Sequence, residues 1–154
     1  MFIQNKNRWL FFNQNKLCIL CGLYPASSSQ VCHACLADLP RIGNACLRCA
    51  NPLTLSQQSQ VICPACQQKA PPFTQVVAPF EYRFPIDQMI QLAKFNGQPH
   101  YLNPLAELLS EHLHDKPLPE LIIPVPLHRK RLQERQYHQA ALLAKRVARN
   151  LGIP

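Results

Sequence analysis

Four Cys-x-x-Cys pairs constrain the fold of this chain more than any other feature of its sequence. Ten, ten and thirteen residues separate successive pairs, and the pairs contain all eight cysteines of the 154-residue chain. Two residues between cysteines let the backbone turn so that both sulfurs reach one tetrahedral ion at about 2.3 Å. The longer gaps suit short β-hairpins, which would bring two such turns together as a zinc ribbon. The predicted metal ligands are Cys18, Cys21, Cys32, Cys35, Cys46, Cys49, Cys63 and Cys66.

Reduced thiols that bind metal are expected here rather than disulfides. The apolar part of residues 1–17, WLFF, is shorter than the 7–15 residues of a signal peptide, and no small-residue cleavage site follows it. No apolar run is long enough to span a membrane, so membrane insertion is not expected. A cytoplasmic location follows, in which Cys-x-x-Cys pairs indicate metal sites.

Two structural zinc ions are the predicted cofactors. The clustered cysteine pattern of ferredoxins is absent, and a thioredoxin-like redox motif would occur once rather than four times. Catalytic zinc keeps an open coordination position, whereas all-cysteine sites are closed. His33 could replace a ligand, but eight cysteines suffice for two ions. Sequential pairing of the four motifs closes the shortest loops, and interleaved pairing costs only slightly more loop entropy, so both remain open.

The rest of the chain has the periodicity of an α/β segment. We expect an N-terminal extension at 1–17, the cysteine module at 18–69 and the α/β segment at 74–154. A module this small needs metal to stabilise it. The expected elements are a strand within 74–84, a helix from Pro85 to before Gly97, a helix from Asn103 to about His114, a buried strand at 121–125 and a helix over 135–151.

Positive charge gathers after the second predicted strand. The formal net charge is +8, and residues 128–149 hold seven of the sixteen Lys and Arg residues against one acid, Glu134. Eight thiolates on two zinc ions would lower the net charge to about +4, but the local excess would persist. A basic loop at 127–135 would lie beyond the end of a strand, where α/β sheets bind ligands, and could hold phosphate, pyrophosphate or nucleic acid. The alternative is a solvated surface, which is how we interpret Lys145, Arg146 and Arg149.

The ordered set of these motifs resembles the ComF/GntX family of competence-associated, phosphoribosyltransferase-like proteins. The resemblance begins at Cys18 and covers nearly the whole chain. It rests on the four cysteine pairs, PPF after Cys66, a Phe/Tyr-rich segment, LAKFNG, and IIPVPL followed by spaced arginines. It implies a double zinc ribbon joined to a type I phosphoribosyltransferase-like fold, of which 74–154 would be the N-terminal half, with an incomplete sheet.

The resemblance also implies functional positions. The family's conserved lysine matches Lys94, its Pro-Val-Pro-Leu matches 124–127, and its two arginines match Arg131 and Arg135. After the second arginine, Gln136 stands where the family has glycine and His138 where it has asparagine. A glycine there would serve either a turn with a positive φ angle or a close approach to phosphate, and its replacement by glutamine weakens the match in both cases.

The family's signature for 5-phosphoribosyl-1-pyrophosphate (PRPP) is an apolar strand, two acidic residues and a Thr/Gly-rich loop. Residues 1–154 contain no such signature. We therefore expect a chain that is C-terminally truncated relative to the family and inactive by itself. Mg²⁺ and PRPP would be ligands of a full-length form only.

These features together predict a competence-associated accessory protein in DNA uptake for natural transformation. It would bind the phosphates of single-stranded DNA or a nucleotide through Lys94, Arg129, Arg131 and Arg135. Phe95 and Tyr137 are candidate base-stacking residues, although both are expected in the core. Two alternatives are a phosphoribosyltransferase whose PRPP-binding half is missing from this chain, and a zinc-ribbon adaptor for another DNA-uptake protein.

Overall fold

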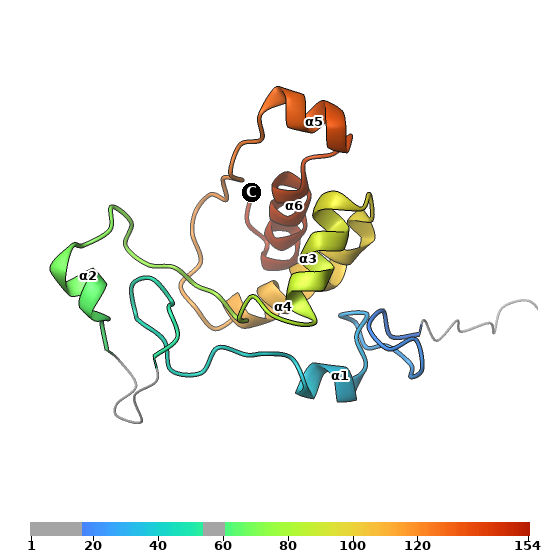
Figure 1. Ribbon diagram of the computed structural model, residues 1–154, viewed down its shortest axis with the longest axis horizontal. Coiled ribbons are helices and arrows are strands. Elements are labelled where there is room, and N and C mark those ends of the chain that lie inside the picture. Colours follow the sequence, from blue (N-terminus) through green and yellow to red (C-terminus); the bar gives the residue numbers. More distant parts are fainter. Residues whose placement is uncertain (1–16, 54–60) are drawn as a thin grey trace, which may run out of the picture.

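A computed structural model describes residues 17–53 and 61–154 of the chain. The predicted N-terminal extension therefore lies outside the described residues, apart from Leu17. Two cysteine-rich segments precede a group of packed helices (Figure 1). No helix in the described part is both long and apolar enough to cross a membrane. The helices are α1 (His33–Ala37), α2 (Pro64–Gln68), α3 (Ile86–Phe95), the 3-10 helix η1 (Pro99–Tyr101), α4 (Leu102–Leu113), α5 (Arg129–Arg135) and α6 (Gln139–Leu151).

The two predicted strands, at 74–84 and 121–125, are wrong. Pairing in the described ranges is limited to three isolated antiparallel bridges, Leu17 with Pro25, Arg41 with Phe80, and Ala45 with Pro52. A strand is stable only when a neighbour pairs with its backbone, and none of the described segments lies beside 121–125 in that way. Prolines that lack an N–H group further limit pairing in both segments. The expected incomplete sheet is thus not formed among these residues.

The predicted helices, one from Pro85 to before Gly97 and one from Asn103 to about His114, are confirmed as α3 and α4. Apolar residues recur on one face of α3, where Ile86, Met89 and Ala93 are buried, and the chain leaves the helix through Gly97 at φ +66°. Helix α4 begins one residue earlier than expected. Pro99 opens the 3-10 turn η1, which runs directly into α4 with Tyr101 as the N-cap.

The predicted basic loop at 127–135 is wrong, because most of it is helical. Gln136 adopts a left-handed conformation (φ +63°) and ends α5, so that α6 starts only at Gln139. A histidine is the N-cap of both α5 and α6. The ring Nδ1 of His128 accepts from the N–H of Lys130 at 3.3 Å, and that of His138 accepts from Ala141 at 2.9 Å. Gln136 therefore has the positive φ angle that the family's glycine at this position suggested.

One apolar core joins the first cysteine segment to the helices. Its buried members are Leu39, Ile86, Met89 and Leu108, and partly buried side chains from both regions pack against it, including Leu20 and Leu36 near the cysteines. The second cysteine segment has a separate core made only of its own residues. In Figure 1, α2 accordingly lies well away from the α3, α4 and α6 group.

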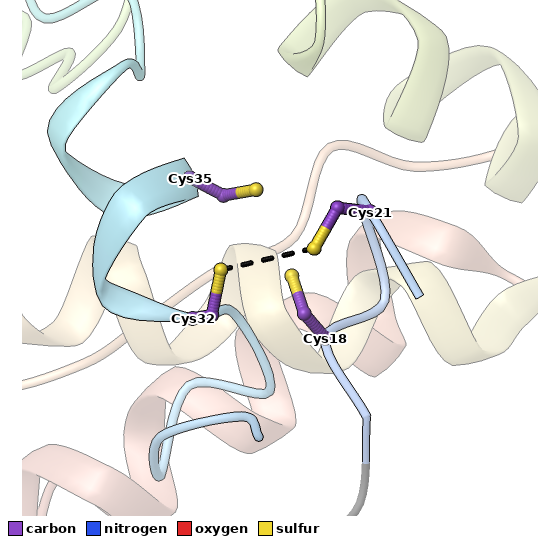
Figure 2. A group of neighbouring side chains, drawn as sticks. All are labelled: Cys18, Cys21, Cys32 and Cys35. Carbon is purple, nitrogen blue, oxygen red and sulfur yellow. Dashed lines mark hydrogen bonds between the residues drawn. The ribbon is translucent and has the colours of Figure 1, made fainter. Parts of the chain in front are cut away.

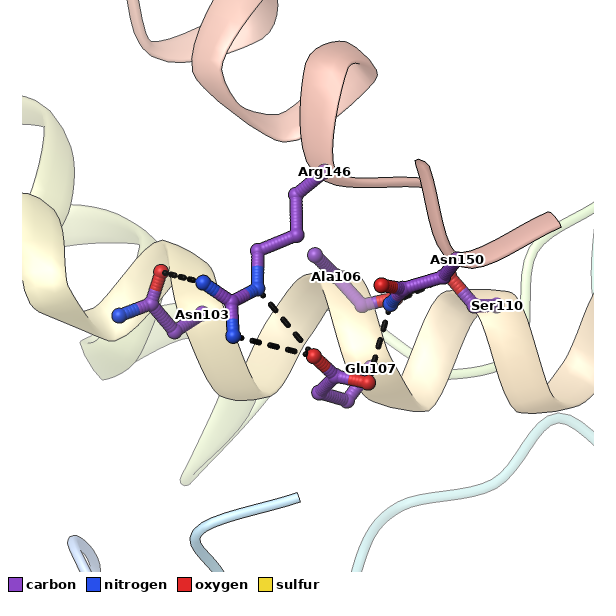
Figure 3. A network of polar contacts seen from close by, with 6 residues as sticks. All are labelled: Asn103, Ala106, Glu107, Ser110, Arg146 and Asn150. Atoms are coloured by element: carbon purple, nitrogen blue, oxygen red, sulfur yellow. Dashed lines mark hydrogen bonds and ion pairs between the residues drawn. The ribbon is translucent and has the colours of Figure 1, made fainter. Parts of the chain in front are cut away.

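Helices α4 and α6 are also joined by polar side chains (Figure 3). The guanidinium of Arg146 contacts the Glu107 carboxylate and the Asn103 side-chain oxygen, each at 3.2 Å. Asn150 donates to the other Glu107 oxygen at 2.9 Å and to the Ser110 hydroxyl at 3.2 Å. Arg146 is therefore a helix-bridging residue, which corrects its interpretation as a solvated surface cation.

Candidate metal centres and cationic cluster

The structure brings the eight cysteines together as two groups of four. Within each group, one ligand atom per residue lies within 4.8 Å of all the others. The Sγ atoms of Cys21 and Cys32 are 3.8 Å apart (Figure 2), and those of Cys49 and Cys63 are also 3.8 Å apart. A tetrahedral ion with metal–sulfur bonds of about 2.3 Å needs sulfurs about 3.8 Å apart. The grouping is the sequential one: Cys18, Cys21, Cys32 and Cys35 in the first cluster, and Cys46, Cys49, Cys63 and Cys66 in the second.

The first half of each cluster repeats one backbone turn. The residue after the second cysteine, Gly22 or Ala50, has a left-handed φ of +66° or +58°. Its N–H donates to the carbonyl of the first cysteine, Cys18 at 2.8 Å or Cys46 at 2.9 Å. This turn aims both sulfurs of a pair at the same point, as a metal-binding knuckle requires.

The second half of each cluster repeats a short helix. Cys32 is the N-cap of α1 and Cys63 is the N-cap of α2, so the next cysteine lies one helical turn further on. His33 is exposed on α1 and belongs to neither four-residue group. The cysteines are thus sufficient for both sites without a histidine ligand.

The thiols of each cluster differ in how readily they ionise. Burial opposes ionisation of Cys18, but backbone N–H groups directed at its sulfur lower its pKa to about 6. At Cys46 the N–H of Cys63, 3.3 Å from the sulfur, is the main cause that lowers the pKa to about 6. Burial and the neighbouring thiols raise the pKa of Cys35, and they raise the pKa of Cys66 to about 12.

Four thiolates so close together repel one another unless a cation lies between them. A divalent metal stabilises the thiolate form of every cysteine that it binds. All four sulfurs of a cluster can then be ionised together, although without metal the pKa of one thiol is lowered and that of another is raised. All-sulfur tetrahedral ligation suits Zn²⁺ and leaves no open position for water or substrate. Both clusters therefore fit a zinc ion whose role is to hold the fold together.

The repeated turns allow a matched pair of substitutions. A left-handed conformation costs a non-glycine residue about 1–2 kcal/mol, so Ala50→Gly should stabilise the second site by about 1 kcal/mol. Gly22→Ala should weaken the first site by a similar amount, because a Cβ there meets no atom within 4 Å and only the backbone conformation is affected. Competition with a chelator should show a change of about fivefold in metal retention, upward for one variant and downward for the other. A change of the same sign in both would contradict this assignment.

A cationic cluster surrounds Phe95 at the end of α3. The Lys94 ammonium lies 5.3 Å from the centre of the Phe95 ring, and the Arg135 guanidinium of α5 lies 5.1 Å from it. Phe95 is 65% exposed, which corrects its expected place in the core. Tyr137 is half-buried, and its hydroxyl donates to the carbonyl of Ala93, so it positions the chain after α5 against α3.

The other two predicted phosphate ligands lie on α5 with different surroundings. Arg131 is one helical turn before Arg135 and forms an exposed ion pair with Glu134 at 2.9 Å. Arg129 is exposed at the start of the helix and points to a different side from Arg131 and Arg135, since it precedes them by two and six positions. The structure therefore brings Lys94 and Arg135 together at Phe95, places Arg131 one helical turn from Arg135 on α5, and leaves Arg129 apart.

Comparison with known proteins first defines the class of the N-terminal part. The sequence model of the double zinc ribbon domain family matches residues 8–67, which include all eight cysteines. The chain is 32% identical over 151 residues to competence protein F of Haemophilus influenzae. It is 30% identical over 140 residues to the DNA utilization protein YhgH of Escherichia coli K12, and 29% identical over 143 residues to YhgH of Salmonella typhi.

The chain is therefore a homologue of competence protein F and YhgH over most of its length, with an N-terminal double zinc ribbon. This confirms the predicted resemblance to competence-associated proteins. The matches cover 94%, 86% and 88% of this chain but only 63%, 60% and 62% of the three relatives. The chain thus spans about three-fifths of the length of these relatives. No solved structure matches at a significant level.

Proposed function

We propose that this chain is a zinc-dependent accessory protein in competence or DNA utilization that binds single-stranded DNA. The names of its relatives support the competence-related part of this role. In the proposal, two structural zinc ions occupy the four-cysteine clusters, the protein acts in the cytoplasm, and the cationic cluster at Phe95 contacts the DNA.

The observation that carries the proposal is the convergence of Lys94 and Arg135 on one exposed aromatic ring. The two cations come from different helices, α3 and α5, and both lie within about 6 Å of the ring centre, the range of a cation–π contact. An aromatic residue held in this way has little conformational freedom left to lose when it binds a ligand.

Single-stranded nucleic acid is the ligand that such a cluster fits. Proteins that bind single strands combine cations along the backbone with aromatic rings on which bases stack, and each stacked base contributes about 1–3 kcal/mol. Lys94 and Arg135 would contact phosphates, while the exposed Phe95 ring or the Arg135 plane would receive a base. Arg131 would add a further phosphate contact after releasing Glu134, because an exposed ion pair of this kind is worth only about 1 kcal/mol or less.

Salt dependence of oligothymidylate binding tests the phosphate contacts. For single strands the log–log slope changes by about 0.7 for each phosphate neutralised, so the double variant Lys94→Gln/Arg135→Gln should flatten the slope by about 1.4. The matched control, Lys69→Gln/Lys116→Gln, removes two charges elsewhere and should leave the slope unchanged. Fluorescence anisotropy between about 50 and 200 mM salt measures both.

Phe95→Leu tests the stacking contact separately. It keeps an apolar side chain but removes the π face, so it should weaken binding by about fivefold or more without altering the salt slope. If the wild-type protein binds no oligonucleotide at low salt, or if all variants keep the wild-type slope and affinity, the proposed function is wrong.

A further inference from the structure

A second cationic surface lies between η1 and α6, away from the contacts that define the Phe95 cluster. An open cavity of about 480 Å³ lies there, with Pro99, His100 and Leu142 among its lining residues. Three basic residues of α6 line the same cavity: Lys145, Arg146 and Arg149. We propose that this cavity is a second phosphate-binding site.

The three α6 cations have different roles. Arg146 is already neutralised by Glu107 and held by Asn103 (Figure 3). It therefore forms a fixed part of the cavity lining. Lys145 and Arg149 are exposed, and no ion pair involves either of them among the described residues. They lie four positions apart and hence on the same side of the helix. Two uncompensated charges on one rigid helix, next to a fixed ion pair, form a local positive field that favours an anion.

The cavity is concave and mixed in character, which distinguishes it from a helix that is merely solvated. Leu142 and Pro99 provide apolar wall, and the His100 ring lies 4.6 Å from the Tyr101 ring, measured between centroids. Binding sites for small molecules and cofactors combine apolar walls with a few directed polar groups in volumes of about 300–1,000 Å³. A phosphate next to a sugar or base matches this combination better than a bare anion does.

The position of η1 suggests where such a phosphate would come from. The chain turns back after Phe95 through Gly97, and the N–H of Gln98 donates to the Leu92 carbonyl at 3.3 Å, so η1 starts against the end of α3. Phe95 and His100 are five residues apart and hence no more than about 18 Å from each other along the chain. A strand held at Phe95 could therefore extend into the η1–α6 cavity, although a free nucleotide would meet the same groups.

The test compares Lys145→Gln/Arg149→Gln with wild type and with the control Lys69→Gln/Lys116→Gln. Both α6 side chains are exposed and outside the Glu107 network, so the fold should be retained, and far-UV circular dichroism checks this. During titration with inorganic phosphate, the amide NMR signals of residues 100–102 and 145–149 should shift in wild type and in the control, and should not shift in the α6 variant.

Binding of a thymidylate of about 12 nucleotides identifies the source of the phosphate. If the site binds the DNA strand, the α6 variant should flatten the salt slope by about 1.4, and this loss should add to that of Lys94→Gln/Arg135→Gln. If phosphate shifts the η1–α6 amides while the DNA slope stays unchanged, the site holds a free phosphate ligand. If neither phosphate nor DNA responds to the α6 variant, the second site does not exist. In that last case, a Lys94→Gln/Arg135→Gln variant that still loses DNA binding would leave the proposed function intact.

Discussion

Cys18→Ser should release one metal ion and also destabilise the helices that follow the cysteine module. Cys18 is 2% exposed in the first cluster, whose neighbours Leu20 and Leu36 pack against the core that contains Met89 and Leu108. Binding of a structural zinc ion is worth about 10–16 kcal/mol in small domains, so a lost ligand costs several kcal/mol. The unfolding temperature of the helices, measured by far-UV circular dichroism, should fall by about 10 °C or more.

Cys46→Ser is the matched control for this prediction. Cys46 occupies the equivalent position in the second cluster and is also 2% exposed, but its core contains only residues of that segment. The variant should also lose one metal ion, counted by native mass spectrometry, while the helices unfold within about 2 °C of wild type. Equal loss of helical stability in both variants would contradict the separate cores. Two bound metals in either variant would contradict four-cysteine ligation.

Leu39→Ala should strongly destabilise the protein while leaving both metal sites intact. Leu39 is 5% exposed and contributes the cysteine segment's buried side chain to the core of Ile86, Met89 and Leu108. Replacing a buried leucine by alanine removes apolar contacts and leaves a cavity, which costs about 2–5 kcal/mol. Urea unfolding should measure this loss, and hydrogen exchange in α3 should become faster.

The exposed Leu47 provides the comparison. It is 46% exposed in the second cysteine segment, so Leu47→Ala should change the free energy of unfolding by no more than about 0.5 kcal/mol. Metal content should remain two in both leucine variants. A Leu39→Ala protein as stable as Leu47→Ala would show that the cysteine segment and the helices do not share a core.

Local patterns in the sequence predicted the features that depend on nearby residues. The spacing of the cysteines indicated two four-sulfur clusters, because a two-residue gap nearly determines the turn that a shared ion needs. Apolar residues at helical spacing, such as Ile86, Met89 and Ala93, identified α3 because a helix satisfies its own backbone hydrogen bonds.

Features that depend on distant residues were missed. The run at 121–125 has the composition of a buried strand, yet Ile123 is 78% exposed because no described segment pairs with it. Histidine is not among the usual N-cap residues, so His128 and His138 gave no recognisable signal for two separate helices. The bridging role of Arg146 depends on Glu107, which is distant in sequence, and the contact between Phe95 and Arg135 depends on where α5 lies.

The unequal attachment of the two cysteine clusters has a consequence for a cell in which metal is scarce. Loss of the first ion would open the core beneath α3 and α4, whereas loss of the second would open only its own small segment. The shared core adds to the free energy that holds the first ion, since unfolding that cluster also exposes helix residues to water. A population short of zinc would therefore accumulate a half-loaded form that keeps its first ion, its helical surface and both cationic sites. In cells grown on limiting metal, the second cysteine segment would then unfold before the helical part of the molecule did.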